Sequence, residues 1–133
     1  MVQDLSNVSD FHRQIGVVRI EAGEGQSAVW LDAGIGARNP KGDVHGGALA
    51  ALCDVAMARA VRSANRDLWG LSTVSLTINY LEPADGDVVA RGRVIKDGGS
   101  LAFAEVEVAS ASGAIVLRAS GVFRKIRKKA PSP

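Results

Sequence analysis

The chain has 133 residues, of which 47% are hydrophobic and 23% are charged, and its formal net charge is +2. These values suit one soluble globular domain with a single core. The only cysteine is Cys53, which excludes an internal disulfide and favours a reducing compartment, and its apolar surroundings predict a small core residue.

The positive charge is concentrated near the end of the chain. Five lysines and arginines fall within residues 124–129, and the rest of the chain is slightly acidic. A nucleic-acid-binding domain needs a basic stripe across its surface, so we expect no nucleic-acid partner. We interpret residues 127–133 as a basic solubilising tail after a domain of residues 1–126. No signal-peptide pattern opens the chain and no apolar stretch reaches the roughly 18 residues of a membrane span, so we expect a cytoplasmic protein without a membrane partner.

The first third of the chain predicts a short helix and a hairpin. Ser9 is a typical N-cap residue and precedes a helical turn at residues 10–14, with His12 expected at the surface. Apolar runs at residues 15–22 and 26–33 flank a glycine-containing turn, a pattern typical of a β-hairpin. A loop rich in turn-forming residues follows at positions 34–43.

A helix is predicted from Gly46 to Ala64, and it holds the most unusual charge in the sequence. Between Ala48 and Ala58 the only charged residue is Asp54. A helix that is apolar on all sides is normally buried, and an ionised carboxylate is costly to bury without partners. Asp54 is therefore a functional candidate on physical grounds.

Four long strands are predicted after the helix, at residues 71–81, 88–96, 101–109 and 115–126. The first alternates strictly, which indicates a half-buried strand with one apolar face. That face would consist of Val74, Leu76, Ile78 and Tyr80. One helix and several antiparallel strands predict an α+β fold in which the sheet wraps around the helix.

Charged residues of the two middle strands are expected to face one another. A hairpin that closes at the glycines after Asp97 brings Arg91 and Arg93 within reach of Glu105 and Glu107. This favours a structural ladder of opposite charges, and contact of the arginines with an anionic ligand is the alternative.

The start of the helix carries groups suited to acyl chemistry. Helix N-termini present unpaired N–H donors, and Gly46 and Gly47 would let a substrate approach that backbone closely. Such donors can hold the oxygen of a polarised carbonyl, while a carboxylate can act as general base or nucleophile. Simpler interpretations stay open: the glycines can form only a tight corner, Asn39 beside Pro40 only a turn, and Asp54 can bond a partner's helix end.

The spacing of these groups limits how they can cooperate. Gly46 and Asp54 lie about 12 Å apart along a helix that rises ~1.5 Å per residue. One carbonyl held at Gly46 cannot also contact Asp54 of the same helix. Either the two groups serve different purposes, or the carboxylate comes from a second chain, which predicts a symmetric dimer with two sites at its interface.

A longer pattern supports the second possibility. Asn39-Pro-x-Gly-x-x-His45-Gly-Gly, followed by Leu52-x-Asp54-x-Ala56, resembles the hotdog-fold thioesterases of the phenylacetate-degradation (PaaI-like) type. The later Leu76-x-Ile78-x-Tyr80-Leu-x-Pro83-Ala84 resembles the strand that follows the helix in that family. The likeness implies a single hotdog domain that hydrolyses acyl-CoA without a metal or cofactor, since coenzyme A is part of the substrate. It also implies homodimers with shared active sites that pair into a homotetramer.

The resemblance implies a role for each matching residue. Gly46 would donate the N–H that polarises the thioester carbonyl, with Gly47 beside it in the substrate-binding set. Asp54 of the partner subunit would be the general base or nucleophile. Asn39 would position the attacking water or the thioester, and His45 would support the carbonyl end of the site.

Further binding residues are implied less directly. A hydroxyl residue early in the next strand assists in such enzymes; counting back from Tyr80 points to Thr73, whereas strand parity points to Ser72, and the choice stays open. Arg91 and Arg93 are candidates to contact the coenzyme A phosphates.

Two other functional classes stay open beside hydrolysis of aryl- or medium-chain acyl-CoA. One is a non-catalytic acyl-CoA-binding or regulatory hotdog module, although a regulator would usually need an added DNA-binding segment. The other is a hotdog hydratase, which favours a His–Asp pair near the acyl chain. His45 adjoins the glycine turn instead, and that position suits a thioester carbonyl better.

Overall fold

A computed structural model describes residues 1–3 and 8–127 of the chain. Its elements in chain order are β1 (Val2–Gln3), α1 (Asp10–Ile15), β2 (Val17–Gly23), β3 (Gln26–Leu31), η1 (Ile35–Ala37), α2 (Gly46–Ala64), β4 (Leu68–Tyr80), β5 (Val88–Asp97), β6 (Leu101–Ser110) and β7 (Ile115–Arg127). The strands form one antiparallel sheet in the order β1-β2-β3-β5-β6-β7-β4. The predicted α+β architecture is confirmed; β1 and η1 were not predicted.

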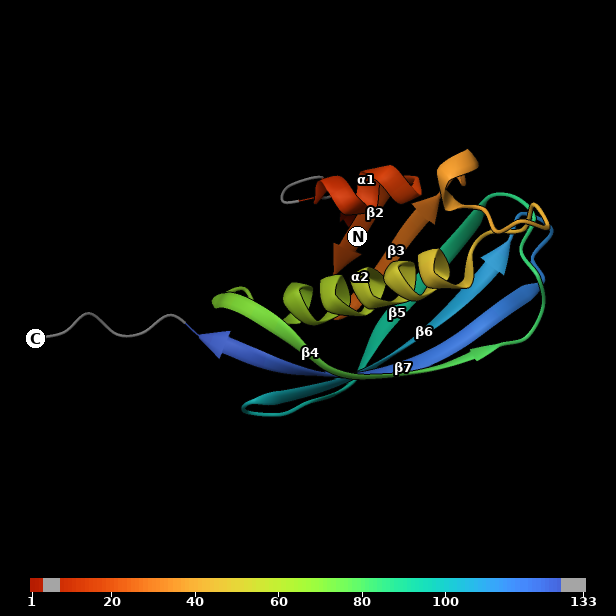
Figure 1. The fold of residues 1–133 in the computed structure, drawn as a ribbon. Helices are drawn as coiled ribbons and strands as arrows, with labels where there is room; N and C mark the ends of the chain where they lie inside the picture. Colours follow the sequence, from red (N-terminus) through yellow and green to blue (C-terminus); the bar gives the residue numbers. More distant parts are fainter. Residues whose placement is uncertain (4–7, 128–133) are drawn as a thin grey trace, which may run out of the picture.

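The sheet curves around α2, which lies across its concave face (Figure 1). The helix packs tightly on the sheet at Gly92 of β5, where an added Cβ atom would sit 2.7 Å from the Ala56 carbonyl oxygen. Ser27 of β3 donates a hydrogen bond to the same oxygen over 2.5 Å. Glycine at position 92 thus lets the helix backbone pack directly on the sheet. No helix in the described ranges is long and apolar enough to span a membrane.

The first hairpin is shorter at its start and tighter at its turn than expected. Ile15 ends α1, and Gly16 follows with φ 105°, so β2 begins only at Val17. At residue 16 an added Cβ atom would sit 2.2 Å from the Asp32 carbonyl oxygen, which explains the glycine. The turn itself is Glu24-Gly25, with both φ values positive, as in a two-residue hairpin.

A bulge in β4 overturns the predicted single apolar face of that strand. Thr73 pairs with Phe123 of β7, but Ser75 pairs with the next residue, Val122, so Val74 is the extra residue. Leu71 lies on the core side before the bulge, and Leu76 does so after it. Val74, assigned to the core face with Leu76, is instead 59% exposed.

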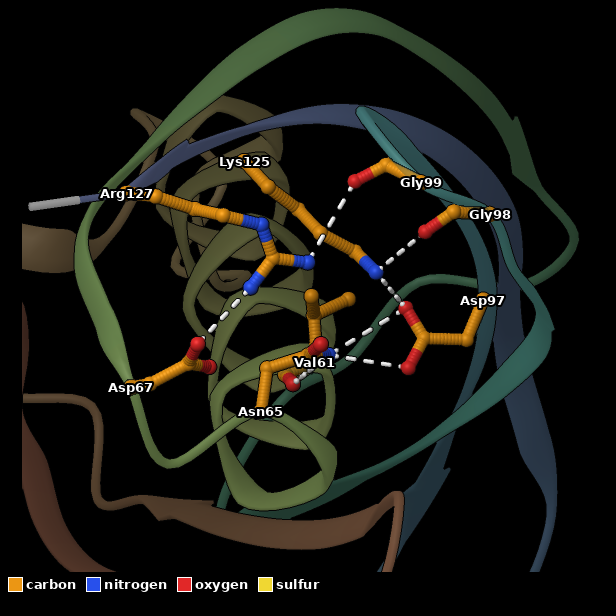
Figure 2. A network of polar contacts seen from close by, with 8 residues as sticks. All are labelled: Val61, Asn65, Asp67, Asp97, Gly98, Gly99, Lys125 and Arg127. Carbon is orange, nitrogen blue, oxygen red and sulfur yellow. Dashed lines mark hydrogen bonds and ion pairs between the residues drawn. The ribbon is translucent and has the colours of Figure 1, made fainter.

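The basic end of the chain begins inside β7, which includes Arg124, Lys125 and the first residue of the predicted tail, Arg127. Lys125 has a side chain only 2% exposed, and it forms an ion pair with Asp97 and donates to the Gly98 carbonyl oxygen. Asn65, the C-cap of α2, donates to the other oxygen of Asp97 over 2.9 Å and to the Val61 carbonyl oxygen over 3.0 Å (Figure 2). These contacts fasten the end of α2 to β7 and to the β5–β6 turn. The rest of the predicted tail, residues 128–133, lies outside the described residues.

The ladder of opposite charges forms as predicted. Arg91 pairs in register with Glu107, and Arg93 pairs with Glu105, with which it also forms an ion pair. Arg118 of β7 extends the ladder through a 3.0 Å ion pair with Glu107. Because side chains alternate along a strand and Gly92 faces α2, Arg91 and Arg93 lie on the convex face of the sheet.

Candidate functional site

The first turn of α2 is organised by His45. His45 is the N-cap, with φ −59° and ψ 133°, and its Nδ1 accepts a hydrogen bond from the Gly47 N–H over 2.8 Å. A neutral imidazole that accepts at Nδ1 carries its proton on Nε2. A Cβ atom at position 47 would approach His45 Nδ1 to 3.0 Å, so the cap itself accounts for Gly47. The tight-corner interpretation therefore applies to this glycine.

Gly46 has no such internal explanation. Its φ is not among the positive values, and an added Cβ atom would meet the Tyr80 ring at an ordinary 3.5 Å. Within the described part of the chain, no atom accepts a hydrogen bond from the Gly46 N–H. The Gly46 N–H is thus an unpaired donor at the positive end of a 19-residue helix. The surrounding structure does not require glycine at this position.

Asn39 shapes the loop that leads to this donor. Its side-chain oxygen accepts hydrogen bonds from the N–H groups of Lys41 and Asp43, over 3.0 and 3.1 Å. The turn-forming interpretation of Asn39 is therefore correct, and its amide NH₂ is the part suited to contact a ligand. Asn39 and Gly46 share a cleft of about 350 Å³, lined also by Leu49, Tyr80, Leu81 and other residues of the 39–44 and 80–84 segments. We call Asn39, His45, Gly46, Gly47 and Tyr80 the glycine cluster.

A second group of polar residues lies further along α2. Thr73 Oγ1 donates a hydrogen bond to Asp54 Oδ1 over 2.7 Å. The bulge at Val74 produces this contact, because it changes which residues of β4 face the helix. Strand parity had favoured Ser72; the structure brings Thr73 to Asp54 instead. We call Asp54 and Thr73 the carboxylate cluster.

His12 lies closer to this carboxylate than the sequence suggested. It is half-buried, where the sequence predicted a surface position, and α1 packs against α2. Burial lowers the pKa of the His12 imidazole, the Asp54 carboxylate raises it in part, and Arg59 lowers it further. Sequence reasoning missed this proximity because a single histidine on a short helix carries no signal of what that helix packs against.

Asp54 is less enclosed than an apolar helix predicts. It is half-buried, as are Ala51 and Ala58, its neighbours one turn away on the same side of α2. The expectation of full burial was wrong, because the sheet covers only part of the helix surface. The adjacent strand β4 is the edge of the sheet, and its side chains Trp69, Val74 and Tyr80 are more than half exposed.

The two clusters do not meet within one chain. Asp54 and Thr73 are absent from the lining of the cleft that holds Asn39 and Gly46. The cleft beside Arg91 and Arg93, of about 300 Å³, shares no residue with it and lies on the convex face of the sheet. Cys53 belongs to neither cluster: it is fully buried, and burial together with Asp54 raises the pKa of its thiol to about 12. Such a thiol is not a nucleophile at neutral pH.

The described residues contain no group of three or more His, Cys, Asp or Glu side chains arranged to hold a metal ion. The two clusters offer a backbone donor, a carboxylate, an amide and an imidazole. A carbonyl oxygen at the glycine cluster would be polarised, and the carboxylate could take a proton from an attacking water or itself attack an acyl carbon.

Comparison with known protein families finds a match that includes Gly46, Asp54 and Thr73. A family model described as the thioesterase superfamily matches residues 41–117. Human acyl-coenzyme A thioesterase 13 is 28% identical over 120 residues, which cover 87% of this chain and 85% of that protein. Relatives from Halobacterium salinarum and Caenorhabditis elegans, named provisionally as esterases, are 41% and 42% identical over 70 and 71 residues; the chain spans 46% and 41% of their length.

Solved structures share the architecture over nearly the whole chain. A conserved protein of Pseudomonas aeruginosa superimposes with a TM-score of 0.84 and 30% identity, covering 90% of this chain and 95% of that one. A Streptococcus mutans protein bound to acetyl-CoA superimposes with a TM-score of 0.80 at 23% identity, covering 95% and 98%. This second likeness shows the fold alone.

Proposed function

The chain belongs to the thioesterase superfamily, and from this premise we propose that it hydrolyses acyl-CoA thioesters to a free acid and coenzyme A. Human acyl-coenzyme A thioesterase 13, similar over most of its length, supports this substrate class. The Asn39-to-Ala56 motif supports assignment to the PaaI-like type, with aryl- or medium-chain acyl groups as substrates.

In the proposed reaction the two clusters act on opposite sides of one thioester. The Gly46 N–H donates to the carbonyl oxygen and stabilises the negative charge that develops there. Asp54 removes a proton from water as the water oxygen attacks the carbonyl carbon. The carbon–sulfur bond then breaks, and the coenzyme A thiolate leaves and takes up a proton. Asp54 as a direct nucleophile, giving an acyl-enzyme anhydride that water cleaves, is the alternative route.

The separation of the clusters supports a site built from two subunits. Gly46 of one subunit and Asp54 of its partner would flank the thioester, with Thr73 orienting the carboxylate. The exposed edge strand β4 and the half-buried alanines beside Asp54 provide a surface for a second copy of the chain. Two such dimers would form the tetramer, and Arg91 and Arg93 are candidates for the coenzyme A phosphates.

The observation that carries the proposal is that the Gly46 N–H is unpaired and that the fold does not require glycine at position 46. It can be tested with two matched substitutions. Gly46→Pro replaces the N–H with a ring carbon and should leave the helix intact: Gly46 is the first helical residue, where proline is well tolerated, and the ψ of 133° at His45 suits a residue before proline. Gly46→Ala keeps the N–H, and its methyl group has room against Tyr80.

We expect Gly46→Pro to lower kcat by about 10²- to 10³-fold, the usual effect of losing one oxyanion donor. Gly46→Ala should retain most of the wild-type kcat and the same melting temperature. The measurement is thiol release from aliphatic, hydroxyaryl and dicarboxylic acyl-CoAs. Equal activity of the two variants would rule out the N–H as the oxyanion donor, and coenzyme A binding without hydrolysis of any ester would indicate a binding module.

A further inference from the structure

We infer that Tyr80 is a positioning residue for the Gly46 N–H, an inference that rests on the proposed hydrolysis. Tyr80 is the last residue of β4, and its hydroxyl donates a hydrogen bond to the Gly46 carbonyl oxygen over 2.7 Å. The residues that bond are 34 positions apart in the sequence, so the contact joins the end of an edge strand to the first turn of α2.

The Tyr80 hydrogen bond is made to Gly46, the residue whose N–H would polarise the substrate carbonyl. The Gly46 carbonyl and N–H flank the same α-carbon, so fixing the carbonyl also limits rotation of the neighbouring peptide that carries the N–H. The Tyr80 ring packs on the same α-carbon, because an added Cβ atom would contact its Cε1 and Cζ atoms at 3.5 Å. Hydroxyl and ring together hold the donor from one side while leaving the N–H itself unpaired.

Tyr80 also faces the cleft in which the thioester would lie. The residue is 53% exposed, and it lines the cleft together with Asn39 and Gly46. Burial of the hydroxyl end, with a smaller contribution from Cys53, raises the pKa of Tyr80, so the hydroxyl stays a donor at any pH at which the protein would be assayed. Tyr80 therefore holds Gly46 without adding a pH dependence of its own.

The test compares Tyr80→Phe with wild-type protein and with Ser112→Ala, a loss of a hydroxyl from the exposed turn between β6 and β7, away from both clusters. We expect Tyr80→Phe to lower kcat by about tenfold, because the donor is held less firmly in the transition state, while KM stays within about twofold. Ser112→Ala should match the wild type. Unfolding midpoints measured for all three proteins separate loss of positioning from loss of fold.

A double-mutant cycle makes the test specific to Gly46. If Tyr80 acts through the Gly46 N–H, Tyr80→Phe should change kcat by less than about twofold in a Gly46→Pro background. Undiminished kcat in the single Tyr80→Phe variant, or the full tenfold loss in both backgrounds, would overturn the inference. A wild-type protein that hydrolyses no acyl-CoA would instead overturn the proposed function, and this inference with it.

Discussion

At the scale of single residues, the same side-chain type takes different roles according to what lies next to it. Gly47 is explained by the His45 cap, whereas no contact among the described residues requires glycine at position 46, which fits its proposed role as a donor to substrate. Asp54 keeps a hydroxyl partner in Thr73 but is left half-open beside small residues. A half-buried carboxylate with one hydrogen-bond partner is suited to contact substrate. A fully buried structural carboxylate would instead have all its acceptor positions filled.

Removing the charge of Asp54 should therefore affect chemistry more than folding. We expect Asp54→Asn to lower kcat by at least about 10³-fold, since an amide can neither take a proton from water nor attack an acyl carbon. The asparagine oxygen can still accept the Thr73 hydrogen bond, so the unfolding midpoint should change little. Steady-state thiol release and thermal unfolding are the two measurements. Normal hydrolysis of every acyl-CoA by this variant would remove Asp54 from the reaction.

His12 gives a prediction for the pH dependence of stability. Its pKa is lowered in the folded protein, so the unfolded chain binds the proton more readily. With respect to His12, the free energy of unfolding should be highest above the ordinary histidine pKa of 6.5 and should fall as the pH drops below it. Urea unfolding across this range should be less pH-dependent for His12→Gln than for the wild type. Parallel curves for the two proteins would contradict the prediction.

At the scale of elements, α2 is held at its two ends by different devices. Its first turn is held by the exposed His45 cap and by Tyr80, which lines the cleft. Its last turn is held by the contacts of the buried Lys125 side chain with Asp97 and of Asp97 with Asn65 (Figure 2). Arg127 adds a peripheral pair with Asp67 over 3.0 Å. The end of the helix that faces the cleft is thus the accessible one, and the opposite end is anchored.

This difference in burial predicts different energetic costs for two neighbouring cations of β7. Lys125→Met should lower the free energy of unfolding by about 2 kcal/mol, because it leaves Asp97 partly buried with a reduced set of partners. Arg127→Met should cost less than about 1 kcal/mol, since both members of its ion pair are well exposed. Denaturant titration of the two variants measures the difference. Equal costs would show that the Lys125 contacts contribute no more than a surface pair.

At the scale of the whole molecule, one chain contains both the glycine cluster and the carboxylate cluster. Neither of the two clefts described above is lined by residues of both clusters. In the proposed dimer, a second copy related by two-fold symmetry would supply the missing half twice, once for each site. Each α2 would then take part in both sites, with its first turn in one and Asp54 in the other. Activity and association of subunits are then expected to be lost together when the chains are separated.

Mixed dimers test this arrangement directly. Asp54→Asn and Gly46→Pro homodimers should each be nearly inactive, because each lacks one half of both sites. A heterodimer of the two keeps one complete site. Random exchange of equal amounts should therefore restore about a quarter of the wild-type specific activity, since half of the dimers are mixed and each has one of two sites. No recovery after proven subunit exchange would exclude a site shared between chains.

Much of the fold could be predicted because local patterns encode it. The bounds of α2, the four long strands and the Arg–Glu ladder follow from the 3.6- and 2-residue periods and from charge placed at fixed offsets. The lone charge of Asp54 and its spacing from Gly46 also stand in the sequence, and they are enough to predict a site that needs a second chain.

The tertiary structure alone decided which side chains meet. Thr73 reaches Asp54 because β4 bulges at Val74, and a bulge depends on register with β7, a strand about 50 residues away. Lys125 is buried because the end of β7 passes the β5–β6 turn, and Tyr80 meets Gly46 because an edge strand ends beside the start of α2. Periodicity describes a strand in isolation, whereas these contacts depend on pairing between distant segments, which no local pattern contains.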